Sequence, residues 1–125
     1  MIFCIDFDGT VVEHEYPEVG ADVPYAENVL RRLQDAGHEL ILWTMRSGAE
    51  LADAVAWFED KQIRLFGVNN NPTQSSWTES PKAYAQTYID DAALGCPLRE
   101  NPRMGGRPFV DWKRVEQVLT NANAL

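Results

Sequence analysis

The chain has 125 residues, of which 19 are Asp or Glu and 11 are Lys or Arg, so its formal net charge is −8. This length favours a single domain over residues 1–125 with a hydrophobic core of its own. A content of 45% hydrophobic and 24% charged residues excludes a disordered chain, and the acidic balance argues against nucleic acid as a partner, because a broad phosphate footprint needs clustered Lys and Arg.

The amino-terminal residues and the cysteines indicate a cytoplasmic protein. The apolar opening Met1–Ile5 stops at Asp6. It is too short for a transmembrane helix and lacks the basic start of a signal peptide. Cys4 and Cys96 form no CxxC pair and no Cys/His spacing for zinc. We therefore expect two free thiols in a reducing cytosol, and no membrane partner.

The first half of the chain alternates strand and helix patterns. The apolar run Ile2–Phe7 predicts a buried strand, and a loop follows over Glu13–Val23. A helix is predicted over Pro24–Ala36 and a second strand over Glu39–Thr44. A second helix begins at Ser47, which has Glu50 three residues on as in a capping box. The apolar stripes of these two helices are Ala26, Val29, Leu30 and Leu33, and then Leu51, Ala54, Val55 and Phe58.

The second half continues the alternation with weaker signals. Predicted strands at Arg64–Val68 and Thr87–Asp90 enclose a loop over Asn69–Glu79 and a short helix opened by Ser80-Pro81. A loop over Arg99–Pro108 precedes a helix after Asp111, whose apolar side would carry Trp112, Val115, Val118 and Leu119. Strand–helix alternation of this kind predicts an α/β fold: a single Rossmann-like, doubly wound parallel sheet with helices on both faces.

Polar residues gather where the predicted strands end. They are Asp6 and Asp8 after the first strand, Thr44 after the second, Lys82 at the start of the short helix, and Asp90 and Asp91 after the fourth strand. The carboxyl ends of parallel strands share one edge of a sheet, so we expect these side chains to meet there. Four neighbouring carboxylates repel one another unless a cation lies among them. Donors that are all oxygen atoms favour Mg²⁺ over zinc.

The same residues resemble the motifs of a known family. Asp6-Phe7-Asp8-Gly9-Thr10 resembles the DxDGT motif of the haloacid dehalogenase-like phosphohydrolase superfamily, and Leu42-Trp43-Thr44 resembles its second motif. Lys82 stands where the third motif has its lysine, and Tyr88-Ile89-Asp90-Asp91 resembles the acidic fourth motif. All four occur in the order of the family and together span Ile2 to Asp91.

The resemblance implies a Mg²⁺-dependent phosphatase that acts on a phosphomonoester. Asp6 would be the nucleophile that forms an aspartyl-phosphate. Asp8 would be the general acid and then the general base, and its presence points to phosphoryl transfer, because true dehalogenases of this superfamily lack it. The residues implied to bind Mg²⁺ are Asp6, the backbone carbonyl of Asp8, Asp90 and, in support, Asp91. Those implied to hold phosphoryl oxygens are Thr44, Lys82 and the amides of Gly9 and Thr10.

Some residues near the motifs have two interpretations. Arg46 is equally well interpreted as a substrate contact and as the partner of Glu50 at i+4. Trp43 is expected in the core and His14 on a solvent-facing flap, although each is near enough to the motifs to contact a leaving group. The arginines of the Arg99–Arg107 loop would either attract anionic substrates or stay solvated.

The spacing of the motifs resembles the capless class of the superfamily. The predicted elements use most of the residues between Thr10 and Thr44 and between Thr44 and Lys82, so neither interval holds a cap domain. An open site would accept a small or a bulky phosphomonoester, or be covered by a second subunit in a homo-oligomer. Two alternatives are a nucleic-acid end-processing phosphatase, suggested by Thr44-x-Arg46 but opposed by the net charge, and a phospho-accepting receiver-type signalling domain, opposed by the motif order.

Overall fold

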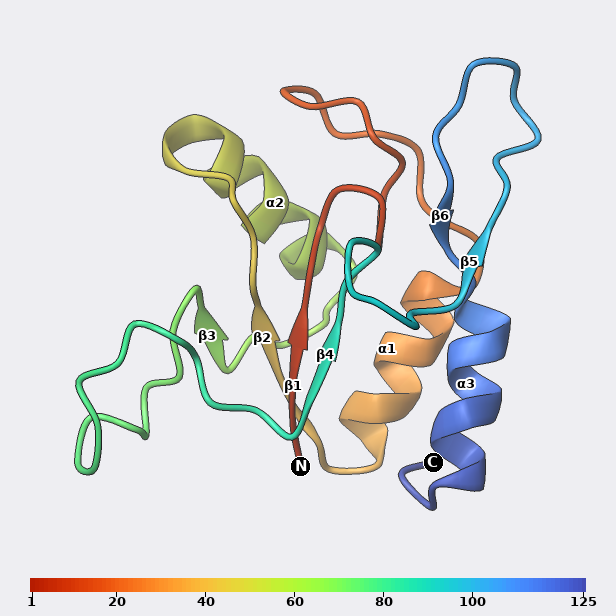
Figure 1. The fold of residues 1–125 in the computed structure, drawn as a ribbon. Helices are drawn as coiled ribbons and strands as arrows, with labels where there is room; N and C mark the ends of the chain where they lie inside the picture. Colours follow the sequence, from red (N-terminus) through yellow and green to blue (C-terminus); the bar gives the residue numbers. More distant parts are fainter.

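A four-stranded parallel sheet lies at the centre of the computed structural model, which describes residues 1–125 (Figure 1). Its strands are β1 (Ile2–Ile5), β2 (Glu39–Leu42), β3 (Gly67–Val68) and β4 (Thr87–Ile89), and they lie in the order β3-β2-β1-β4. The chain moves outward from β1 to β3 and then returns to place β4 on the other side of β1. This reversal opens a crevice at the carboxyl ends of β1 and β4, where α/β proteins bind ligands.

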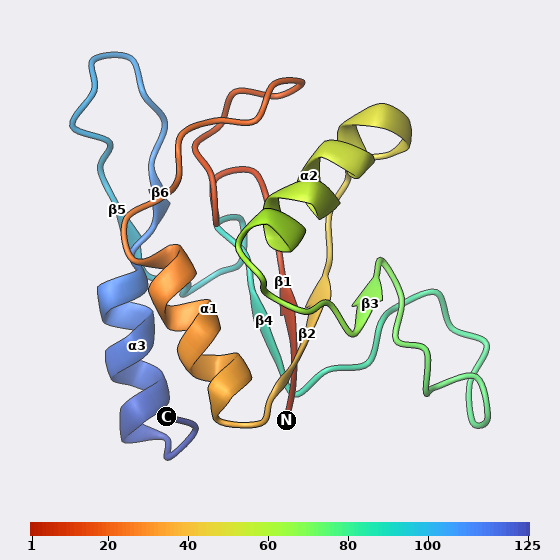
Figure 2. The same cartoon turned by 180° about the vertical axis from the view of Figure 1, so that it is seen from behind.

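Three helices share the main core with the sheet. They are α1 (Ala26–Asp35), α2 (Gly48–Asp60) and α3 (Trp112–Asn121), and Figure 2 shows α2 in front of β1 and β2. Phe3 and Ile5 of β1 belong to the same buried cluster as the apolar residues of all three helices. The predicted α/β class and the parallel sheet are thereby confirmed, whereas the helices predicted on both faces of the sheet all pack against this one face.

The other face of the sheet is covered by a loop where a helix was expected. Cys4 and Ile41 alternate with the residues of the main core and pack against Ala83, which lies in the connection from β3 to β4. The helix predicted at Ser80-Pro81 is absent, so that prediction was wrong. The buried side chain of Gln74 accounts for this: it donates to the carbonyls of Ser80 and Lys82 and accepts from the amide of Tyr84. Side-chain bonds of this kind compete with the helical hydrogen bonds of the backbone.

The apolar residues predicted to face the core on each helix are packed there, with one exception. The four apolar residues predicted for α1 are all buried, and Leu51 and Val55 of α2 pack at the margin of the core, where Trp57 adds a buried ring. In α3, Val118 is 52% exposed, because the neighbouring Val115 and Leu119 already face the core. None of the helices has the length and the apolar character needed to cross a membrane.

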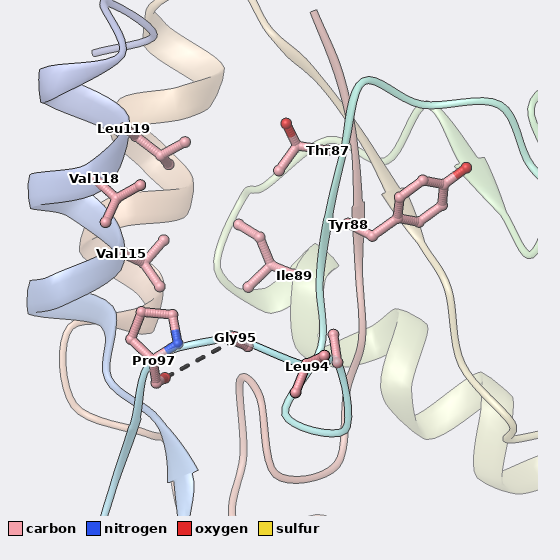
Figure 3. Close-up of a pocket in the computed structure, with 11 residues that line it drawn as sticks. Thr87, Tyr88, Ile89, Leu94, Gly95, Pro97, Val115, Val118 and Leu119 are labelled. Carbon is pink, nitrogen blue, oxygen red and sulfur yellow. Dashed lines mark hydrogen bonds between the residues drawn. The ribbon is translucent and has the colours of Figure 1, made fainter.

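The carboxyl-terminal part contains a hairpin that the sequence did not predict. β5 (Leu98–Arg99) and β6 (Phe109–Val110) pair antiparallel and lead into α3. An apolar cavity of about 250 Å³ lies between the outer edge of β4 and α3, lined by residues such as Ile89, Leu94 and Val115 (Figure 3). It contains none of the carboxylates that were expected to meet at the sheet edge.

Candidate functional site

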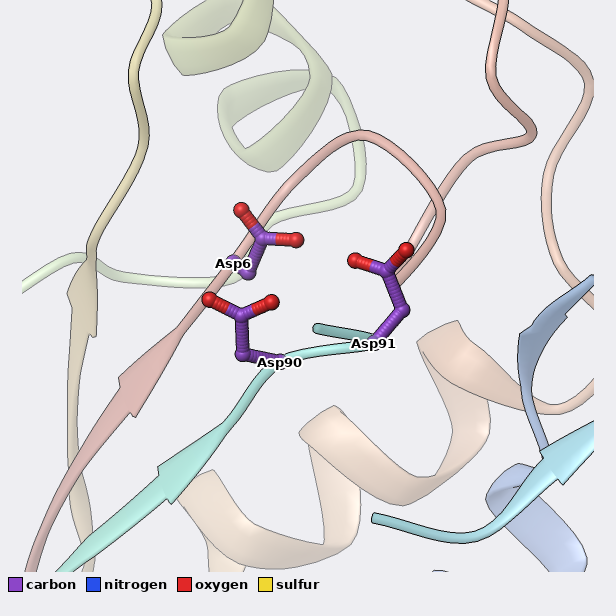
Figure 4. Close-up of side chains that lie close together, drawn as sticks. All are labelled: Asp6, Asp90 and Asp91. Atoms are coloured by element: carbon purple, nitrogen blue, oxygen red, sulfur yellow. The ribbon is translucent and has the colours of Figure 1, made fainter. Parts of the chain in front are cut away.

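Three carboxylates meet where β1 and β4 end. Asp6 directly follows β1, and Asp90 and Asp91 directly follow β4. One oxygen of each carboxylate lies within 4.8 Å of the others, and Figure 4 shows the three side chains around a common space. Ile5 pairs with Ile89 in parallel register, so the two strands end at the same level and bring these residues together. The expected cluster is therefore present for these three residues.

The surroundings of Asp6 disfavour the ionised form of its carboxyl group. Burial raises the pKa of Asp6 from 3.8 to about 8, and the charge of Asp90 acts in the same direction. A hydrogen bond from the Thr10 hydroxyl to the Asp6 carboxylate, at 2.8 Å, opposes this shift only in part. A hard divalent cation would stabilise the ionised form of Asp6, and donors that are all oxygen atoms fit Mg²⁺.

Thr10 and His14 hold Asp91 in place. The Thr10 hydroxyl accepts the amide of Asp91 at 3.2 Å, and Nε2 of His14 lies 2.9 Å from Oδ2 of Asp91. The His14 side chain is only 16% exposed, so the expectation of a solvent-facing residue was wrong. Gly9 makes this contact possible: its φ is +80°, and a Cβ there would collide with the imidazole of His14. Sequence reasoning had weighed His14 as a solvent-facing flap residue or a contact to the leaving group, and not as a partner of Asp91.

The amides of Gly9 and Thr10 are already used within the turn after β1. Gly9 donates to the carbonyl of Val12 at 2.7 Å, and Thr10 donates to the carbonyl of Phe7 at 3.1 Å. The prediction that these two amides hold phosphoryl oxygens was therefore wrong, because the turn itself satisfies them.

Asp8 and Arg46 form a bidentate ion pair. Nε and Nη2 of Arg46 donate to the two carboxylate oxygens of Asp8 at 2.8 and 2.7 Å. Arg46 is 2% exposed, so it cannot contact a substrate in this arrangement. It also does not pair with the carboxylate of Glu50 but donates to that residue's backbone carbonyl. Neither interpretation of Arg46 holds, because its guanidinium binds the carboxylate of Asp8, which lies 38 residues away in the sequence.

A pocket of about 280 Å³ opens beside the carboxylates. It is lined by Asp6, Asp90, Thr44, Trp43, Met45 and Asn69. Thr44 is therefore at the site as predicted, and Trp43 has one side in the pocket besides its packing on the sheet. Asn69 is a residue that sequence reasoning missed. It follows β3 at the same sheet edge, and its side chain accepts the amide of Thr44 at 2.7 Å. The position directly after a predicted strand was the signal that could have identified it.

The structure does not bring Lys82 to the carboxylates. Lys82 is exposed, and its ammonium lies 5.6 Å from the centre of the Tyr88 ring. It lines a separate depression with Trp77 and Tyr84. Because the helix expected at Ser80-Pro81 does not form, the segment that carries Lys82 follows a different course over the sheet.

One arginine of the last loop connects two loops of the structure. Nη2 of Arg103 bonds to the carboxylates of Glu13 and Glu15 at 2.6 and 2.9 Å. The guanidinium of Arg99 lies 5.8 Å from the centre of the Phe109 ring, and Arg107 is exposed. Arg103 is therefore engaged by carboxylates of the chain itself, and the attraction of anionic substrates by this loop stays a prediction.

Comparisons with known proteins place the chain beside one solved structure. Comparisons with protein-family models and with curated proteins found no match. The solved structure is that of a conserved protein from Bacteroides thetaiotaomicron, which is 32% identical to this chain and superposes with a TM-score of 0.77. The match covers 98% of this chain and 91% of the other. At this identity and coverage, the chain belongs to the same family as that conserved Bacteroides thetaiotaomicron protein.

Proposed function

We propose that this protein is a Mg²⁺-dependent phosphatase that hydrolyses a phosphomonoester through an aspartyl-phosphate on Asp6. The observation that carries the proposal is the convergence of the Asp6, Asp90 and Asp91 carboxylates in the crevice between β1 and β4. The resemblance of four segments to haloacid dehalogenase-like motifs supports the same chemistry. Of the other residues implied by that resemblance, Thr44 lines the pocket beside Asp6 and Asp90, whereas Lys82 lines a separate depression.

Mg²⁺ would be held by Asp6, Asp90 and the backbone carbonyl of Asp8, with Asp91 in support. Bound there, it would neutralise the charge of the carboxylates and of an incoming phosphate. The Thr10 hydroxyl donates to the Asp6 carboxylate and accepts the amide of Asp91. The same hydroxyl therefore keeps two of the proposed ligands in a fixed relation before any cation binds.

The chain's own residues account for both halves of the reaction. The Asp6 carboxylate forms a bond to phosphorus, and the bond from phosphorus to the leaving oxygen breaks as Asp8 gives that oxygen a proton. Asp8 then takes a proton from a water molecule that attacks phosphorus, which breaks the bond to Asp6 and releases inorganic phosphate. The Thr44 hydroxyl accepts the amide of Arg46 at 3.2 Å, so its own proton is free for a phosphoryl oxygen.

The surroundings of the site bear on the substrate and the compartment. The pocket beside Asp6 is bordered by Met45, which is 98% exposed, so a bulky leaving group would extend past it into solvent. The net charge of −8 favours small or peptide-like phosphomonoesters over nucleic acid. The free thiols of Cys4 and Cys96 support action in the cytosol.

A phosphatase screen tests the proposal. A panel of metabolite phosphates, phosphorylated oligonucleotides and phosphopeptides is assayed with Mg²⁺ and again with excess chelator. We expect turnover that requires Mg²⁺ and disappears in Asp6→Asn. The matched control is Asp35→Asn, which changes an exposed aspartate of α1 and should leave turnover unchanged.

Three outcomes would contradict the proposal. They are turnover that survives the chelator, turnover that survives Asp6→Asn, and no turnover of any substrate in the panel. Selective hydrolysis of oligonucleotide ends would support the nucleic-acid alternative. A long-lived phosphoenzyme without turnover would support the receiver-type alternative, since a phosphatase hydrolyses its aspartyl-phosphate rapidly.

A further inference from the structure

Every N–H of the Arg46 guanidinium has a partner inside the protein. Nε and one N–H of Nη2 bind the Asp8 carboxylate. The second N–H of Nη2 donates to the carbonyl of Glu18 at 2.7 Å. The two N–H groups of Nη1 donate to the carbonyls of Pro17 and Glu50, each at 3.2 Å. Arginine has five such donors in a planar fork, so this side chain has no capacity left for a further acceptor.

The five acceptors belong to three separate parts of the molecule. Asp8 lies in the turn after β1, Pro17 and Glu18 lie in the flap (residues 13–22), and Glu50 lies in the first turn of α2. The guanidinium is also enclosed by rings, with its central carbon 4.9 Å from the centre of Phe7 and 5.2 Å from that of Tyr16. A single buried cation therefore determines how the flap lies against the carboxylate of Asp8.

Resting on the proposed function, we propose that Arg46 is a positioning residue that orients the Asp8 carboxylate for proton transfer and ties this orientation to the docked flap. The fork fixes the plane of the carboxylate through both of its oxygens. A carboxylate has about four acceptor positions, of which the fork occupies two, so Asp8 keeps positions for a leaving-group oxygen or a water. Proton transfer depends steeply on such alignment.

A purely structural role for Arg46 would have a different consequence. Loss of a structural ion pair lowers the amount of folded protein, and this reduces the turnover of every substrate by the same factor. Loss of a contact that orients the general acid reduces turnover more strongly for a basic leaving group, because such a group needs a proton in order to leave. The dependence of rate on the leaving group therefore separates the two roles.

The kinetic experiment uses Arg46→Lys, which keeps the buried charge but removes the fork. The substrates are 2,4-dinitrophenyl, p-nitrophenyl and phenyl phosphate, whose leaving groups are increasingly basic. We expect kcat/KM to fall by at most about threefold on the first and by about 10²-fold on the last, within the range of general acid catalysis. Arg32→Lys, in an exposed ion pair between α1 and α3, is the matched control and should change none of the three rates.

A double-mutant cycle tests whether Arg46 acts through Asp8. If it does, Asp8→Asn shows the same dependence on the leaving group, and Asp8→Asn combined with Arg46→Lys is no slower than Asp8→Asn alone. Equal losses on all three substrates, or losses that multiply in the double variant, would overturn the proposal.

A second measurement needs neither Mg²⁺ nor a substrate. Amide hydrogen exchange in residues 13–22 should become faster in Arg46→Lys and in Asp8→Asn, and should stay unchanged in Arg32→Lys. Unchanged exchange in Arg46→Lys would overturn the connection to the flap even if the protein is a phosphatase. Absence of any phosphatase turnover in the wild-type protein would instead remove the proposed function, so the two failures are distinguishable.

Discussion

Asp6 shows how the surroundings of one residue change its ionisation. The side chain follows a strand whose last three residues are buried, so little water reaches it, and Asp90 adds a second negative charge nearby. Both effects raise the pKa of Asp6 from 3.8 to about 8. A nucleophile must be ionised to attack phosphorus, and a cation among the carboxylates is the means by which this site would keep Asp6 ionised at neutral pH.

The raised pKa of Asp6 predicts an unusual dependence of stability on pH in the absence of metal. The contribution of a group with a raised folded pKa is fully present below the unfolded value of 3.8 and is lost as the pH rises toward about 8. In chelator, the free energy of unfolding of the wild type relative to Asp6→Asn should therefore decrease from pH 5 to pH 8.5. Urea unfolding of both proteins at the two pH values measures this difference.

Addition of Mg²⁺ is the control for that measurement. At pH 8.5 it should restore stability to the wild type and have a much smaller effect on Asp6→Asn, since ligands that bind only the folded state stabilise it. A difference between wild type and variant that does not change with pH would show that Asp6 ionises normally in the folded protein.

Among the helices and strands, the sequence predicted correctly those that are determined by a local pattern of apolar residues. The i, i+3, i+4 spacing of α1 and the apolar runs of β1 and β2 are confirmed, because each is determined by burial of one short segment. The meeting of Asp6, Asp90 and Asp91 was also predictable. Parallel strands that follow one another through crossovers must end at one edge, and polar residues directly after such strands converge there.

The residues whose surroundings were predicted wrongly are held by contacts between segments that are distant in the sequence. No local signal shows that the Gln74 side chain will hold Ser80, Lys82 and Tyr84 and so prevent a helix. The pairing of Arg46 with Asp8 and of His14 with Asp91 likewise joins residues far apart in sequence. Each β5–β6 strand has only two residues, which is too short for an alternating pattern to appear.

The amino-terminal ends of α2 and α3 provide a prediction at this scale. Asp111 accepts the amide of Arg114 at 3.1 Å, whereas Ser47 makes no side-chain bond to α2 despite its capping-box pattern with Glu50. Asp111→Ala should therefore lower the free energy of unfolding by about 1 kcal/mol, the usual effect of losing such a cap. Ser47→Ala should lower it by clearly less, and urea unfolding compares the two. Equal losses would mean that the cap at Asp111 contributes nothing specific.

For the molecule as a whole, two loops rise above the carboxyl edge of the sheet. Figure 1 shows the flap and the loop between β5 and β6 on the same side of the sheet as the acidic crevice. The flap is attached on one side to α2 through Arg46 and on the other to the β5–β6 loop through Arg103. Asn101 adds a bond to Glu13 at 2.6 Å. The carboxyl edge of the sheet is thus bordered by two loops that bind each other through these side chains.

The contact between these loops leads to a prediction about their motion. The Arg103 side chain is 55% exposed, and exposed ion pairs contribute about 0–1 kcal/mol to stability. Arg103→Ala should therefore leave global unfolding nearly unchanged while hydrogen exchange becomes faster in residues 13–15 and 100–106. Arg107→Ala, which removes an exposed arginine of the same loop that forms no ion pair, is the matched control. Because salt screens exposed charges, high salt should accelerate exchange in the wild type and have little effect on Arg103→Ala. Equal exchange in the two variants would show that the loops are held together by their backbones and not by Arg103.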